Sequence, residues 1–251
     1  MDILSDKEIN EIILDIFKGV ITVEQLPVNL YLAIADKLLS AFDNIEGVPS
    51  DALLKELSEN IYIFSGAKVY QQINDISLLS EQGGIKSYSD FRDEALKIYD
   101  QYNGWLETEY NTAIANAQQA VRWEQIEDQK KTLPFLKYSA VMDDNTSEIC
   151  VALDGICLSV EDPFWNTNSP TNHWNCRCLI EQLDAEDAAS QITPQSEANK
   201  VSEDLNDKRQ PMFNNNPGKD KEIFSKESPY FSNVPKDLAK VNFNLPIPDE
   251  E

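Results

Sequence analysis

The sequence contains a single histidine, His173, and only 21 basic residues against 44 acidic ones. One histidine cannot assemble a histidine-rich metal hydrolase site or a His-Asn-His nuclease. The formal net charge of -23 repels phosphate backbones and anionic lipid headgroups. We therefore expect neither direct binding of nucleic acid by the bulk surface nor a membrane partner. The sequence also has no glycine-rich phosphate loop, no Ser-His-Asp spacing and no internal repeat.

Long apolar runs are missing as well. No window reaches the roughly 18 apolar residues that a membrane span requires. Residues 1–8 have neither the basic start nor the apolar core of a signal peptide. We therefore expect a protein made and kept in a cytoplasm. In that reducing setting, clustered cysteines are expected to be thiols or metal ligands rather than a disulfide framework.

Helical patterns occupy the first half of the chain. Apolar residues recur at steps of three and four, and a capping box at Ser5–Glu8 begins the first run. The glycines Gly66 and Gly83-Gly84 are interpreted as helix ends. The predicted helices cover residues 6–18, 22–45, 50–66, 67–76 and, as the longest, 87–131.

The pattern changes after Pro134. Residues 138–142, 156–160 and 176–182 are predicted strands, with a short helix before the second strand, and together they form a small α+β module. From about residue 185 onward, seven of the twelve prolines occur and apolar periodicity is lost, which predicts an extended or disordered C-terminal arm.

The predicted fold is therefore mainly α: an N-terminal helical body with one long helix, followed by a small α+β Cys/His module and an extended C-terminal arm. The predicted regions are an N-terminal helical region (1–84), the long helix leading into the module (85–135), the module (136–184) and the arm (185–251).

The module holds all four cysteines and the histidine. His173-x-x-Cys176 spans one tight turn, so both side chains can reach one ion, and a cysteine from the preceding hairpin can complete a tetrahedral zinc shell. The candidate ligands are Cys150, His173, Cys176 and Cys178, with Cys157 as the alternative. In an extended segment Cys176 and Cys178 would point to opposite faces, which disfavours sharing a metal. A disulfide, or packed thiols with a hydrogen-bonding histidine, remain alternatives.

An enzyme would have to use the same residues. A nucleophilic Cys-His pair is the one catalytic constellation that the sequence offers, formed by Cys150, Cys176 or Cys178 with His173. Between residues 138 and 187, a single basic residue, Arg177, stands against ten acidic ones, which is unfavourable for phosphate chemistry. We therefore predict that the protein is not an enzyme and assign no catalytic residue.

Three blocks of residues carry a family resemblance. They are Asp143-x-x-Thr146-Ser147-x-x-Cys150-x-x-Leu153-Asp154-Gly155, then Asp162-Pro163-Phe164-Trp165, then Pro170-x-Asn172-His173-x-Asn175-Cys176-Arg177-Cys178. In their order and spacing, these blocks resemble the phage Mu F-like minor head proteins, also called the phage head morphogenesis family. The resemblance covers roughly residues 90–231 and is strongest over 143–182. Many family members carry a cysteine where this chain has Ser147.

The resemblance implies a minor capsid protein of a tailed phage, made in the host cytoplasm and located in the virion head near the portal. The implied partners are the portal protein, the major capsid protein or both, with self-association, and the implied roles are head assembly and genome delivery. The implied cofactor is at most a structural zinc ion. A Cys/His-dependent enzyme and a host-directed effector injected from the virion are the alternatives.

Overall fold

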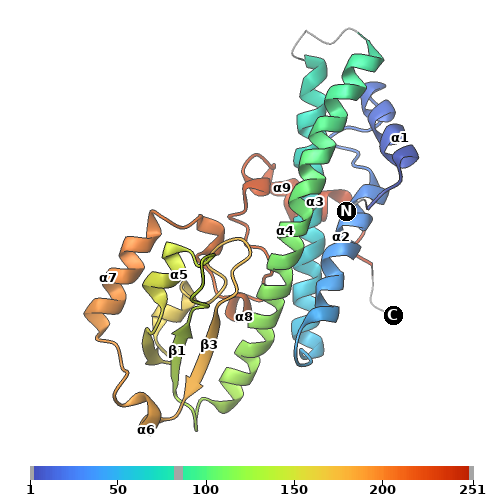
Figure 1. The fold of residues 1–251 in the computed structure, drawn as a ribbon. Helices are drawn as coiled ribbons and strands as arrows, with labels where there is room; N and C mark the ends of the chain where they lie inside the picture. Colours follow the sequence, from blue (N-terminus) through green and yellow to red (C-terminus); the bar gives the residue numbers. More distant parts are fainter. Residues whose placement is uncertain (1–2, 82–86, 249–251) are drawn as a thin grey trace. The chain divides into compact units, whose positions relative to one another are not determined.

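The computed structural model describes residues 3–81 and 87–248, and the predicted break at Gly83-Gly84 lies outside these ranges. The described chain is mainly helical with one small antiparallel sheet, as predicted (Figure 1). It forms two compact units, whose boundary falls within the long helices α3 (Asp51–Glu81) and α4 (Tyr88–Gln129). Unit 1 comprises residues 1–41, 58–110 and 228–251, and unit 2 comprises residues 42–57 and 111–227.

Unit 1 begins with α1 (Asp6–Phe17), which the predicted capping box starts: the Ser5 hydroxyl accepts from the Glu8 amide, and the Glu8 carboxylate accepts from the Ser5 amide. The next helix, α2 (Val28–Leu39), starts later than the predicted residue 22. Pro27 precedes it in an extended conformation and fixes its start. A 3-10 turn, η1 (Ser40–Asn44), follows.

Helix α3 runs straight through Gly66, so the predicted break there is wrong. A Cβ atom at Gly66 would lie 2.6 Å from a ring carbon of Phe243. The glycine therefore makes room for an aromatic ring of the C-terminal segment and does not end the helix. In a single sequence, a glycine that allows a close approach cannot be told apart from a glycine that ends a helix.

A buried ion pair joins α3 to α4 inside unit 1. Lys68 Nζ donates to both carboxylate oxygens of Glu109, at 2.8 and 2.7 Å, and to the Tyr102 carbonyl oxygen at 2.9 Å. The Tyr230 hydroxyl donates to the same carboxylate at 2.5 Å. These contacts tie the C-terminal segment to the helices, and they satisfy two charges that burial would otherwise make unfavourable.

Unit 2 is built on a three-stranded antiparallel sheet in the order β2-β1-β3 (Figure 1). Its strands are β1 (Phe135–Ser139), β2 (Cys157–Ser159) and β3 (Leu179–Leu183). The first strand begins three residues before the predicted position, because pairing starts directly after Pro134. Leu136 and Tyr138 alternate inward, and they pack in one core with α5 (Glu148–Leu153), α7 (Gln195–Asn206) and the second half of α4.

The C-terminal region is not the extended or disordered arm that the sequence predicts. It contains α6 (Ala185–Ala188), α7, α8 (Pro217–Asp220) and α9 (Lys236–Lys240), with 3-10 turns η3 (Pro211–Phe213), η4 (Pro229–Phe231) and η5 (Asn242–Asn244). Two buried residues of α7, Ala198 and Leu205, join the core of unit 2. At Gly218, a Cβ atom would lie 2.2 Å from the Trp123 Cβ atom. The region is held by a few close contacts rather than by a periodic apolar stripe, which is why the sequence pattern missed it.

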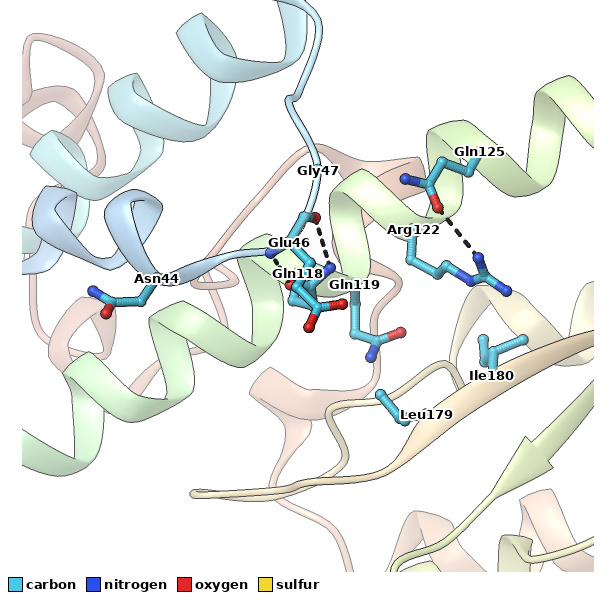
Figure 2. A pocket seen from close by; sticks show the side chains of 9 residues that line it. All are labelled: Asn44, Glu46, Gly47, Gln118, Gln119, Arg122, Gln125, Leu179 and Ile180. Atoms are coloured by element: carbon cyan, nitrogen blue, oxygen red, sulfur yellow. Dashed lines mark hydrogen bonds between the residues drawn. The ribbon is translucent and has the colours of Figure 1, made fainter.

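The segment before α3 is fastened to α4 within unit 2. The Gln118 side chain accepts from the Glu46 amide at 2.6 Å and donates to the Glu46 carbonyl at 3.0 Å (Figure 2). The Ser50 hydroxyl donates to the Glu124 carboxylate at 2.6 Å.

Over the described residues, no helix combines the length and the apolar character that crossing a membrane requires.

Candidate metal centre

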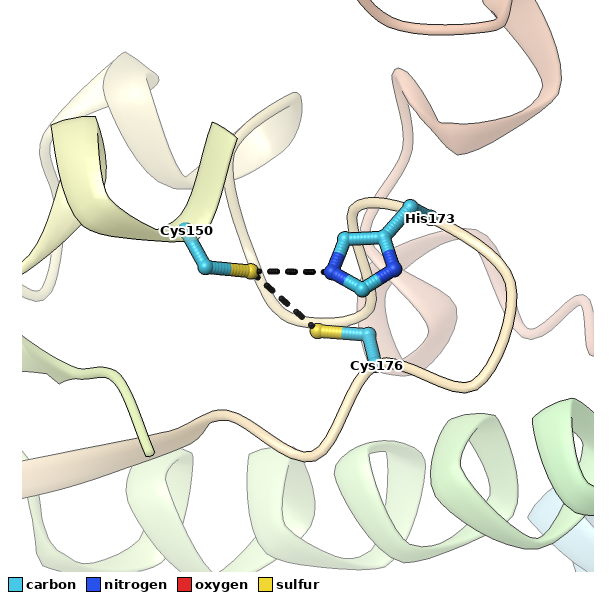
Figure 3. Close-up of side chains that lie close together, drawn as sticks. All are labelled: Cys150, His173 and Cys176. Atoms are coloured by element: carbon cyan, nitrogen blue, oxygen red, sulfur yellow. Dashed lines mark hydrogen bonds between the residues drawn. The ribbon is translucent and has the colours of Figure 1, made fainter. Parts of the chain in front are cut away.

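Cys150, His173 and Cys176 come together in unit 2 (Figure 3). Cys150 lies on α5, and the other two lie on the loop between η2 (Pro163–Asn166) and β3. Cys150 Sγ is 3.2 Å from His173 Nε2 and 3.7 Å from Cys176 Sγ. All three ligand atoms lie within 4.8 Å of one another, so the group could hold a metal ion.

The imidazole of His173 is oriented by the backbone. Its Nδ1 atom lies 2.8 Å from the Trp174 carbonyl oxygen, which can only accept a hydrogen bond. Nδ1 therefore carries a proton, and Nε2 is directed at the Cys150 sulfur. A histidine that binds a metal through one nitrogen commonly donates its other N–H to such a carbonyl.

The surroundings shift the pKa values of the cluster residues in different directions. Hydrogen bonds from Cys176, Cys178 and His173 lower the pKa of the Cys150 thiol, against the opposing effect of burial. The pKa of Cys176 is raised, chiefly by its hydrogen bond to Cys150, and the pKa of His173 is raised, chiefly by the same sulfur. The lowered pKa of Cys150 favours its thiolate form beside a histidine that stabilises it, and a bound cation would be stabilised in the same place.

The remaining cysteines have different positions. Cys178 interacts with Cys150 and Cys176, and the hydrogen bond to Cys150 raises its pKa. The predicted opposition of Cys176 and Cys178 rested on a strand over 176–182, but β3 begins only at Leu179. Cys157 lies on β2, where its backbone bonds to Thr193, and it is not part of the Cys-His group.

Several motif residues shape the chain around the cluster. The Ser147 hydroxyl accepts from the Cys150 amide at 3.2 Å and so caps α5. The Asp154 carboxylate accepts from the Ala140 amide at 2.9 Å. Gly155 then takes a left-handed conformation, φ 78°, that favours glycine, and its amide donates to the Tyr138 carbonyl.

A second set of motif residues positions the loop itself. Arg177 forms a bidentate ion pair with Asp143, at 2.7 and 2.8 Å, and this arginine holds the pKa of the carboxyl at about 2. Asn175 has a φ of 57°, a region in which asparagine is tolerated. Its backbone N–H donates to the side-chain hydroxyl of Thr112, a buried residue of α4. These contacts fix the residues on both sides of Cys176.

The Asp162-Pro163-Phe164-Trp165 block forms the start of η2. The Asp162 carboxylate accepts from the Phe164 amide at 2.9 Å, and Pro163 occupies the first turn, where no amide is needed. The fully buried Trp165 donates its indole N–H to the Ser159 carbonyl at 3.0 Å. This block therefore anchors the beginning of the loop to β2.

No pattern in the sequence predicted the polar network that supports the loop. Arg209, which is 3% exposed, donates to the side-chain oxygens of Asn168, Asn172 and Asn214. Asn172 in turn donates to the Tyr138 hydroxyl at 3.1 Å, and that hydroxyl lies 3.6 Å from Cys150 Sγ. Burial lowers the pKa of Arg209 to about 10, so the guanidinium remains charged at neutral pH.

The cavity at the cluster is small. Its volume is about 10 Å³, and it is lined by Cys150, His173, Cys178, Ser147 and their neighbours. A cavity of this size holds about one water molecule or ion. Small-molecule sites are typically about 300–1,000 Å³. This cavity, which Cys176 does not line, suits an ion better than a substrate. Cys176 and Cys178 also line a separate hollow of about 460 Å³ beside α4.

The fold and the site define a mainly helical protein with a small Cys/His α+β module. Residues 68–181 match the family described as Phage Mu protein F like protein. The resemblance predicted from the sequence is confirmed over these residues.

Two curated relatives match part of the chain. The putative capsid assembly protein F of Escherichia phage Mu is 36% identical over 80 residues, which are 32% of this chain and 18% of that protein. The Mu-like prophage FluMu F protein of Haemophilus influenzae is 37% identical over 78 residues, which are 31% of this chain and 18% of that protein. The chain thus matches less than a fifth of each relative. No solved structure shows a significant match.

Proposed function

We propose that the chain is a minor capsid protein of a tailed phage and associates with portal or major capsid subunits during head assembly. The observation that carries this proposal is the family match over residues 68–181, with a relative named as a capsid assembly protein. The net charge of -23 favours contact with a basic protein surface over contact with packaged DNA. In this proposal the protein is not an enzyme and resides in the virion.

Co-expression with the portal protein and the major capsid protein of the same phage tests this association. We expect the chain to co-sediment with one of the two, and with assembled heads. Separate sedimentation in every combination would contradict the proposal. Because the proposed contact is with a basic protein surface, the experiment includes low and high salt, and we expect the association to weaken at high salt.

We further propose that the cluster binds a structural zinc ion through Cys150, His173 and Cys176, with Cys178 as the fourth ligand. Thiolate and imidazole are the ligands that structural zinc takes. The orientation of His173 by the Trp174 carbonyl and the ion-sized cavity support this choice. Bound zinc would join α5 to the loop before β3 and stabilise the module against unfolding.

Metal analysis of the purified full chain tests the zinc proposal. We expect about one zinc per chain. Cys150→Ser and Cys176→Ser should each lose it, whereas the matched control Cys157→Ser should keep it, because that buried cysteine lies outside the group. Equal metal contents in all three variants would contradict the assignment.

A Cys-His enzyme is the second candidate, and one observation favours it: the lowered pKa of Cys150 beside His173 is also what a thiolate nucleophile shows. Against it stand the 1% exposure of Cys150 and the ion-sized cavity. Titration with iodoacetamide separates the two candidates. A metal-free protein with one fast-reacting thiol supports the enzyme, and a zinc protein with slow thiols supports the structural site.

A further inference from the structure

The outer edge of β3 carries backbone groups that the sheet does not use. In β1, the Tyr138 amide donates to the Ile156 carbonyl, and the Tyr138 carbonyl accepts from Gly155, so Tyr138 bonds toward β2. Hydrogen-bonding directions alternate along a strand. The adjacent residue Lys137, paired with Glu181, therefore bonds toward β3.

The same alternation applies to β3. The backbone N–H and C=O groups of Glu181 are directed at β1. The backbone N–H and C=O groups of Ile180 and Gln182 therefore point to the open edge. No hydrogen bond from the described residues occupies these groups. The other edge of the sheet is closed, since Thr193 exchanges two hydrogen bonds with Cys157 on β2, at 2.8 and 2.9 Å.

A groove runs beside the open edge. It has a volume of about 500 Å³ and lies between β3 and α4, with the side chains of Gln118, Gln119, Arg122 and Gln125 on the helix side (Figure 2). A second hollow of about 460 Å³ continues it toward Asn111 of α4 and shares Gln118, Gln119 and Leu179 with it. From residue 111 to residue 125, α4 extends about 21 Å, the length of about six residues in an extended chain.

The groove is polar, and its lining holds one cationic side chain, Arg122, and one carboxylate, Glu46, with no ion pair between them among the described residues. Arg122 donates to the neutral Gln125 side chain at 3.2 Å, and no ion pair of Arg122 is found among the described residues. An arginine without a carboxylate partner is locally complementary to an acidic group from outside, whatever the charge of the rest of the surface. The net charge of -23 disfavours a second copy of the chain as the occupant.

We propose that this groove binds an extended segment of a partner protein, which adds a strand to the β3 edge through Ile180 and Gln182 and places a carboxylate on Arg122. Main-chain hydrogen bonds would supply affinity, and the pairing with Arg122 would supply specificity. The exposed side chain of Leu179 offers the segment an apolar contact at the start of the strand.

A displayed library of random octapeptides, selected on the full-length protein, tests this proposal. We expect the selected peptides to be enriched in Asp and Glu. Their affinity should fall about tenfold or more for Arg122→Glu. The matched control Arg92→Glu, an exposed arginine on the same helix, should change it less than about twofold.

Amide hydrogen exchange on the peptide complex locates the contact. We expect the amides of Ile180 and Gln182 to exchange more slowly in the complex, with Glu181, already bonded to β1, unchanged. Failure to select any peptide, equal binding to both arginine variants, or unchanged exchange at the β3 edge would each overturn the proposal. The test uses no capsid component, so its failure is distinct from a failure of the proposed head function.

Discussion

Arg209 offers the most informative single perturbation of the module. Its guanidinium holds the side-chain oxygens of Asn168 and Asn172, both fully buried, and of Asn214. Arg209→Leu would leave the two buried oxygens without this donor. Each buried acceptor left unsatisfied costs about 1–3 kcal/mol, so the free energy of unfolding should fall by roughly 2–6 kcal/mol. Arg209→Lys keeps the positive charge but cannot reproduce the planar set of N–H donors of the guanidinium. It should therefore recover only part of the lost stability.

Urea unfolding followed by tryptophan fluorescence measures this loss, because Trp123, Trp165 and Trp174 all lie in unit 2. The control is Lys208→Leu, which removes the neighbouring exposed cation and should change stability by no more than about 0.5 kcal/mol. An Arg209→Leu variant as stable as this control would refute the reasoning. It would mean that the asparagine oxygens find water or other donors when the guanidinium is removed.

Three further outcomes follow from the geometry. Ser147→Cys places a thiol beside Cys150 and should tighten zinc binding about tenfold or more, measured by competition with a chelator. The Asp143 carboxyl should titrate near pH 2 in NMR spectra and return toward its ordinary pKa in Arg177→Gln; its stabilising contribution is present above about pH 4 and is lost as the pH falls toward 2. Gly218→Ala brings a Cβ atom within 2.2 Å of the side chain on which it packs and should destabilise by about 1–3 kcal/mol, whereas Gly104→Ala, with open space around it, should not destabilise.

The long helix α4 could be predicted because its apolar residues repeat over many turns. The pattern behind α4 predicted one helix over 87–131, and the structure has it over Tyr88–Gln129. In contrast, α7 has few buried apolar residues, so no periodic signal marked it as a packed helix. At Gly66 the decisive contact is with Phe243, far away in the sequence, and no local pattern can reveal it.

The grouping of Cys150, His173 and Cys176 could also be predicted, because one tight turn joins His173 to Cys176 and the connection between the first two strands, which forms α5, supplies Cys150. The place of Cys178 could not, since it depends on where β3 begins. The support from Arg209 was hidden for a different reason. A lone arginine in a polar segment is usually exposed, and only the folded chain shows that three asparagines surround it.

The central claim is that this chain is a component of a phage head. Quantitative mass spectrometry of gradient-purified particles, from the phage or induced prophage that encodes the chain, tests it most directly. We predict that the chain is present at a constant ratio to the portal protein in every particle fraction. Its absence from purified particles and from assembling heads would contradict the account.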